Sequence, residues 1–141
     1  MSIQFFDEDS GFEIKNPDFI SQWIQDISSE FGYQIEELNY IFCSDSYLHA
    51  MNKKYLQHDY LTDIITFDNS EPNQNTIEGD IFISIDRVKD NAKTLQVAFE
   101  DELDRVLAHG LLHLIGFGDK TEEEQKVMTE KEDACLSLRG K

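Results

Sequence analysis

The chain has 141 residues, of which 40% are hydrophobic, and this length suits a single domain with one core. Its 29 acidic residues outnumber 12 basic ones, which gives a formal net charge of −17. Such a surface argues against broad binding to nucleic acid or anionic membranes, because that binding needs clustered lysine and arginine. A contact with nucleic acid then requires a local positive site or a metal ion. The acidity suits docking on a basic protein, or it serves only solubility.

Two cysteines, Cys43 and Cys135, stand far apart among apolar residues and form no CxxC pair. This pattern favours free core thiols in a reducing compartment over a disulfide framework. The first residues show no basic segment followed by an apolar stretch, and no apolar run is long enough to span a membrane. We therefore expect a cytoplasmic protein that is not embedded in a membrane. The oligomeric state is not predicted.

The first half of the chain alternates short apolar runs with amphipathic stretches, which predicts strands alternating with helices. The pair Asn16-Pro17 is typical of a helix start, with Asn16 as the N-cap, and Gly32 is expected to end that helix. Ser44 is expected to cap the second helix. In chain order we expect a strand over 3–6, a helix over 17–31, a strand over 38–43, a helix over 45–55 and a strand over 63–67.

A polar segment over residues 68–78, rich in asparagine, serine and proline, is expected to be a flexible loop. Gly79 and Asp80 then open a fourth strand that runs to Ile85. Asp86 is expected to cap a helix over 87–96. The apolar face of the strand is predicted from its alternation as Ile81, Ile83 and Ile85.

A long helix is expected over residues 99–115, with a buried stripe of leucines at helical spacing. Its polar face carries Glu102, Arg105, His109 and His113. A last helix begins with the capping box Thr121 to Glu124. We expect that helix to bury Val127, Ala134, Cys135 and Leu138.

These elements predict an α/β protein with a single small domain over residues 1–141. Strands and helices alternate early and helices dominate later, which indicates a mixed sheet of about four strands packed with about five helices. We expect a metal site on the central helix.

The metal site is predicted from His109, His113 and Asp119. Two histidines four residues apart on a helix leave the same face, so both imidazoles reach one cation. Gly116 is placed to end the helix, and the reversal that follows brings Asp119 back as a third ligand. Three protein ligands and one open position are the layout of a catalytic zinc site. One zinc ion is the first choice, and nickel, cobalt, iron or manganese suit the same donors.

The same spacing occurs in zinc peptidases of the metzincin type. Those enzymes need a glutamate directly after the first histidine as the general base. Gly110 stands there in this chain, which argues against peptidase activity.

The segment from His109 to Asp119 resembles the YbeY family, the bacterial endoribonucleases of ribosomal RNA maturation, which carries His-Gly-x-Leu-His-Leu-x-Gly-Tyr-Asp-His. The resemblance extends from about residue 38 to the C-terminus through Asn52-x-x-Tyr55, Thr62–Phe67 and Gly79–Ser84. It implies a small α/β sandwich with a metal cleft, and metal-dependent cleavage of single-stranded RNA. The implied setting is 3′-end processing of small-subunit rRNA and ribosome quality control, with the small ribosomal subunit or its basic proteins as partners.

Two positions depart from the family pattern. Asp119 replaces the third histidine; it still ligates zinc, but it lowers the charge of the site by one unit and should make the bound water less acidic. Leu56 stands where the family usually has an arginine after the tyrosine. Lys120 is the first candidate to take over phosphate contact, because it adjoins a ligand, and Lys53 and Lys54 are further candidates.

Arg105 lies one turn before His109, where it either reaches the substrate phosphate or pairs with Glu102. The predicted catalytic group is a metal-bound water held by His109, His113 and Asp119, which attacks the phosphodiester. No protein general base is identifiable, although the cleft candidates are His58, Thr62 and Asp63. Two alternatives stay open: a metal-dependent hydrolase of another substrate, and a non-catalytic ribosome-assembly factor whose metal is structural.

Overall fold

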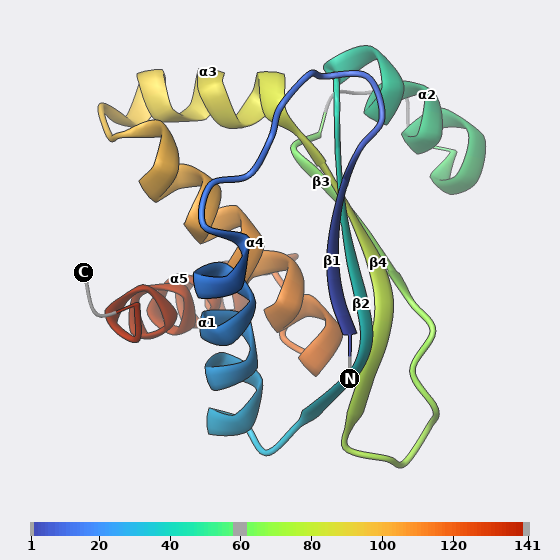
Figure 1. The fold of residues 1–141 in the computed structure, drawn as a ribbon, viewed down its shortest axis with the longest axis vertical. Coiled ribbons are helices and arrows are strands. Elements are labelled where there is room, and N and C mark those ends of the chain that lie inside the picture. Colours follow the sequence, from blue (N-terminus) through green and yellow to red (C-terminus); the bar gives the residue numbers. More distant parts are fainter. Residues whose placement is uncertain (1, 58–61, 140–141) are drawn as a thin grey trace.

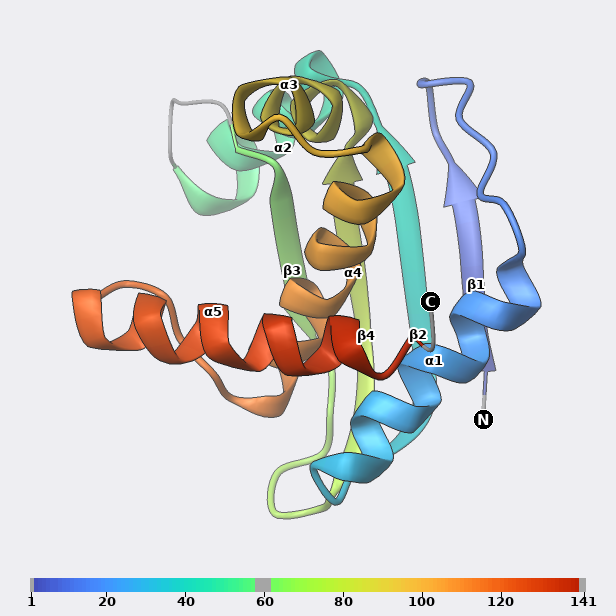
Figure 2. The same ribbon diagram turned by 90° about the vertical axis from the view of Figure 1, so that its left-hand side faces the viewer.

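The computed structural model describes residues 2–57 and 62–139, and this part contains one four-stranded sheet with five helices (Figure 1). The elements are β1 (Ser2–Asp7), α1 (Pro17–Glu30), β2 (Gln34–Cys43), α2 (Asp45–Leu56), β3 (Ile64–Asp68), β4 (Thr76–Ser84), α3 (Ile85–Leu95), α4 (Phe99–Ile115) and α5 (Glu122–Ser137). Helices α1 and α4 cover one face of the sheet, and α5 crosses the outer side of α4 (Figure 2). Helix α2 packs on the opposite face (Figure 1).

The strand order β1-β2-β4-β3 combines parallel and antiparallel pairs. β1 and β4 each run parallel to β2, whereas β3 is antiparallel to β4. Parallel neighbours need a crossover, which α1 supplies between β1 and β2, while residues 69–75 join β3 to β4 as a hairpin. The predicted fold class, a mixed sheet of about four strands with about five helices, is therefore confirmed.

Helix α4 is the centre of the hydrophobic core. Its Leu107 and Leu111 are fully buried, and the Tyr40 hydroxyl of β2 donates to the Leu107 carbonyl at 3.0 Å. The buried indole N–H of Trp23 on α1 donates to the Cys135 carbonyl of α5 at 2.8 Å. Truncating a buried leucine to alanine typically costs about 2–5 kcal/mol, so this core fixes how α4 stands against the sheet and against α5.

Two helix starts differ from the predictions. Asn16 adopts left-handed backbone angles, φ 53° and ψ 55°, and its side chain caps nothing, although Pro17 does stand in the first turn of α1. A capping side chain needs extended backbone angles at its own residue. At α3 the cap is Ser84, whose Oγ accepts from the Arg87 N–H at 3.2 Å. The prediction of Asp86 as that cap is wrong.

Asp86 serves a different helix, because its carboxylate accepts from the Asp45 N–H at 2.9 Å in the first turn of α2. Ile85 consequently belongs to α3 and not to the strand. β4 also begins earlier than expected, at Thr76, because Thr76 and Ile77 pair with β2. The loop predicted over 68–78 is thus shortened to 69–75.

The buried stripe of α5 also differs from the prediction. Ser44 and Thr121 cap α2 and α5 as expected, and Thr121 forms the full capping box with Glu124. Cys135 is buried as expected, but Val127 and Leu138 are 40% and 42% exposed and Ala134 is also exposed. The residues that α5 buries are Met128, Glu132 and Cys135. A buried glutamate in this stripe needs partners, and these lie on α4.

Candidate metal centre

His109 and His113 on α4 and Asp119 in the connection to α5 bring their ligand atoms together. The Nε2 atom of each histidine lies 3.3 Å from Asp119 Oδ2, and all three ligand atoms lie within 4.8 Å of one another. Two ligands bound tetrahedrally to zinc at about 2.0–2.1 Å stand roughly 3.3 Å apart. The side chains are 19%, 24% and 40% exposed, so the site opens to solvent on one side.

The connection after α4 is shaped to return Asp119 to the histidines. Gly116 has φ 124°, an angle that disfavours side chains, and its N–H donates to the Leu112 and His113 carbonyls. Phe117 then packs edge-on against Phe31, the residue after α1, with ring centroids 5.5 Å apart. These contacts hold the start of the reversal, and after it the Gln125 side-chain amide donates to the Asp119 carbonyl at 3.1 Å.

Glu132 of α5 is the functional residue that sequence reasoning missed. It is 7% exposed, and its Oε2 lies 2.5 Å from His109 Nδ1. A carboxylate that accepts the Nδ1 proton leaves the Nε2 lone pair for a metal and holds the ring in place. Its spacing in the sequence could have indicated its burial, because Glu132 stands four residues after Met128 and three before Cys135 and so lies on the same face of the helix.

The electrostatics of His109 follow from this contact. Burial lowers the pKa of His109, but the hydrogen bond with Glu132 and the charges of Glu132, Asp119 and Asp63 outweigh burial, so the net pKa is raised. A metal and a proton compete for the Nε2 lone pair. A metal ion at this position would therefore bind best when the pH is above the raised pKa.

Arg105 also faces α5. Its Nη1 lies 2.8 Å from Glu132 Oε1, and its Nη2 lies 2.6 Å from Asp133 Oδ1. The predicted pairing with Glu102 is therefore replaced by pairing with two carboxylates of α5. Glu102 is itself buried, and burial together with the charge of Asp63 raises its pKa.

Among the predicted cleft residues, Asp63 comes near the histidines and His58 lies outside the described residues. Burial raises the pKa of Asp63, while the positive charge on His109 lowers it in part, and the Asn91 amide donates to its Oδ2 at 3.3 Å. The Thr62 hydroxyl donates to the Ile64 carbonyl at 3.2 Å. Thr62 thus acts as a turn residue, and Asp63 is a half-buried carboxyl group near His109.

The candidates for phosphate contact are spread apart. Leu56, Lys53 and Lys54 belong to α2, which packs on the opposite face of the sheet from α4 (Figure 1). Lys54 Nζ lies 5.2 Å from the centre of the Tyr55 ring. Lys120 directly follows Asp119, with its backbone N–H donating to Glu124 Oε1 at 3.2 Å. Of the three lysines, only Lys120 adjoins a ligand.

The space around Gly110 is too small for a glutamate at this position between the two histidines. A Cβ atom there would lie 2.9 Å from the Ile64 Cδ1 and the Ile81 Cγ2 atoms, which is closer than carbon atoms pack. Helix α4 is pressed against β3 and β4 at this point. The geometry has no room for the general base of a metzincin peptidase.

Comparison with known proteins gives consistent results. The family model described as Endoribonuclease YbeY matches residues 3–139. A relative named Endoribonuclease YbeY from Cytophaga hutchinsonii is 58% identical, over 98% of this chain and 96% of its own. One of the same name from Amoebophilus asiaticus is 50% identical, over 96% and 91%.

A solved structure is also similar. The solution structure of a Thermotoga maritima protein matches with a TM-score of 0.67 and 26% identity, covering 98% of this chain and 89% of that one. None of the described helices is both long and apolar enough to cross a membrane.

Proposed function

This chain belongs to the YbeY family of endoribonucleases, and on that premise we propose that His109, His113 and Asp119 hold one zinc ion for the hydrolysis of single-stranded RNA. The observation that carries the proposal is the convergence of both Nε2 atoms on Asp119 Oδ2 at 3.3 Å. Two imidazoles and one carboxylate are donors that zinc accepts. The reaction belongs to 3′-end maturation of small-subunit rRNA and to ribosome quality control, the setting of this family.

When bound, zinc supplies a Lewis acid for a phosphoryl oxygen and lowers the pKa of a water molecule. The side chains of this protein prepare the site for it. Glu132 accepts a hydrogen bond from the Nδ1–H group of His109. This hydrogen bond leaves the Nε2 lone pair directed toward the ligand position. Asp119 adds a negative charge, so the site attracts a divalent cation more strongly than three neutral ligands would.

We assign Arg105 a positioning role in addition to the substrate contact predicted for it. Its guanidinium donates to Glu132 Oε1, while His109 contacts Oε2, so Arg105 fixes the carboxylate that orients the ring. Lys120 is the proposed contact for the phosphate of the RNA. The proposed partners are single-stranded rRNA and the small ribosomal subunit or its basic proteins, in the cytoplasm.

The test replaces one ligand. We expect His113→Ala to lose stoichiometric zinc in elemental analysis and to cleave single-stranded RNA about a thousandfold more slowly, since the metal supplies several kcal/mol of transition-state stabilisation. The matched control is His49→Ala, which alters a histidine on α2, away from the site. A chelator should abolish cleavage by the wild type and by the control alike.

Two outcomes would contradict the proposal. Full zinc content in His113→Ala would show that His113 is not a zinc ligand. Equal residual cleavage in wild type, His113→Ala and chelated samples would show a contaminating nuclease, and the enzymatic function would then be withdrawn.

A further inference from the structure

The free edge of β1 lines a groove of about 570 Å³. Five consecutive residues of the strand, Ile3 to Asp7, form one wall, and the segment 12–14 with the start of α1 forms the other. Successive residues of a strand point to opposite faces. A groove that contacts all five of them therefore runs along the backbone edge of β1 and not across one face of the sheet.

The backbone groups on this edge are available for pairing. The Glu8 N–H donates to the Phe42 carbonyl at 2.8 Å, and in a parallel ladder alternate residues bond to the same neighbour. Phe6 and Gln4 therefore direct their N–H and C=O groups toward β2. The alternate residues Ile3 and Phe5 direct theirs into the groove, and within residues 2–57 and 62–139 β1 has β2 as a neighbour on one side and no strand on the side of the groove.

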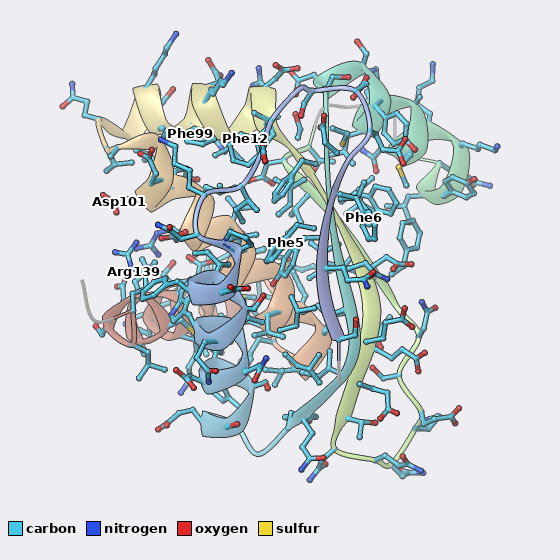
Figure 3. All side chains as sticks on the ribbon, in the orientation of Figure 1. Phe5, Phe6, Phe12, Phe99, Asp101 and Arg139 are labelled. Atoms are coloured by element: carbon cyan, nitrogen blue, oxygen red, sulfur yellow. The ribbon has the colours of Figure 1, made fainter. Side chains whose placement is uncertain are left out.

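This edge lacks the usual protection against pairing. Edge strands commonly carry lysine, proline or a bulge, whereas Ser2–Asp7 has neither residue and keeps a regular register with β2. The floor is aromatic, with Phe12 packed edge-on against Phe42 at 5.0 Å between ring centres. Phe5 and Phe12 lie on the side of β1 that faces the helices, and Phe6 lies on the other side, 48% exposed (Figure 3).

The charge of the groove selects the kind of occupant. Its lining includes Asp7, Glu13 and Asp18 and no lysine or arginine, and Glu8 and Asp9 follow the strand directly. Glu13 and Asp18 are exposed, so they are free to meet a cationic partner. The same charges repel RNA, and they would face each other if two copies of the chain paired through β1.

We propose that the free edge of β1 docks an extended, lysine- or arginine-rich segment of a partner protein by strand addition. Backbone hydrogen bonds to Ile3 and Phe5 provide the pairing, apolar side chains of the segment rest on the aromatic floor, and its cations meet Glu13 and Asp18. The strand order places this edge at the far side of the sheet from β3. The metal centre stays open while the segment is bound, so the proposal is independent of the proposed function.

The first test measures binding of a short peptide in which lysine alternates with valine, by fluorescence anisotropy on the full-length protein. We expect saturable binding, and no binding of a peptide in which glutamate replaces the lysines. The double variant Glu13→Lys, Asp18→Lys should weaken binding by about tenfold. The control Glu36→Lys, Glu71→Lys makes the same change in net charge at exposed positions outside the groove.

The second test locates the peptide by amide hydrogen exchange in wild-type protein, which does not depend on any variant folding. The amides of Ile3 and Phe5 should gain protection when the peptide binds. Equal weakening in the two double variants, protection at β3 instead of β1, or absence of binding would each overturn the proposal. So would protection of the Ile3 and Phe5 amides by a single-stranded oligonucleotide instead of the peptide, or a doubled mass in light scattering that the Glu13→Lys, Asp18→Lys variant abolishes.

Discussion

The two edges of the sheet are built on different principles. Next to β3, the proposed site is built from side chains: Glu132 of α5 contacts His109 of α4, and Arg105 of α4 pairs with Glu132. At β1, the proposed binding groups are the backbone N–H and C=O groups of the strand edge, which lie beside an aromatic floor and exposed carboxylates. A metal site needs ligands held to within tenths of an ångström, whereas strand addition needs only an unpaired edge.

The largest expected effect comes from filling the space between α4 and β3. Gly110→Glu should destabilise the fold by more than about 4 kcal/mol, because overpacking and burial of a carboxylate add up. The measurement is the free energy of unfolding in urea. Ala50→Glu, at an exposed position of α2, is the control and should change stability by less than about 0.5 kcal/mol. A stable Gly110→Glu protein would mean that α4 does not press on the sheet as described.

The next effect separates the carboxylate that touches His109 from its neighbour. Glu132→Gln should weaken zinc binding by about 10–100-fold, the usual cost of losing a carboxylate behind a metal-binding histidine. Asp133→Asn is a close control, because Asp133 also pairs with Arg105 but is 61% exposed and does not contact the histidine. Zinc affinity is measured by competition with a chelating dye. Equal losses of zinc affinity in both variants would show that the effect comes from disturbing Arg105 and not from the contact between Glu132 and His109.

A smaller effect concerns pH. Since the pKa of His109 is raised, protons should compete with zinc at higher pH than for an ordinary histidine, and affinity should fall by at most about tenfold per pH unit below that pKa. Glu132→Gln removes the negative charge and leaves only a neutral amide oxygen to accept from Nδ1, so the fall should begin at lower pH. The measurement is zinc affinity across pH in both proteins. Coincident pH profiles would show that Glu132 does not set the proton affinity of the ring.

The smallest effect compares one thiol from each side of the sheet. Burial, with the charges of Asp9, Asp7 and Glu8, raises the pKa of Cys43 to about 12. Burial and the charge of Glu132 raise that of Cys135 to about 11. Both should stay protonated at pH 8 and alkylate slowly, with Cys135 faster by less than about tenfold, because a more basic thiolate is also more nucleophilic. Mass spectrometry after timed iodoacetamide treatment measures this, and rapid modification of either cysteine would contradict its burial.

Sequence reasoning succeeded where the interactions are local. Thr121 and Glu124 form the predicted capping box, and the helix predicted over residues 99–115 is α4 with the same bounds. It failed where residues compete for a partner elsewhere in the fold. Ser84 caps α3, while the Asp86 carboxylate accepts a hydrogen bond from the first turn of α2. The local sequence around Asp86 does not indicate that these two helices are neighbours.

The register of α5 is the clearest such case. Its apolar residues are too few to define one face, so the pattern left Val127 and Leu138 as plausible core residues, and both are exposed. Glu132 turns inward together with Met128 and Cys135. Its burial is tolerable only because Arg105 and His109 of another helix supply an ion pair and a hydrogen bond.

By itself, the sequence determined the metal-binding motif, since four-residue spacing on a helix places His109 and His113 on one face whatever surrounds them. It also determined the family resemblance and the alternation that leads to a mixed sheet. Only the tertiary structure decided that Glu132 stands behind His109, that Gly110 touches β3 and β4, and that β1 keeps a free edge. The reason is that burial and pairing depend on which elements become neighbours, and neighbours are chosen by the whole core.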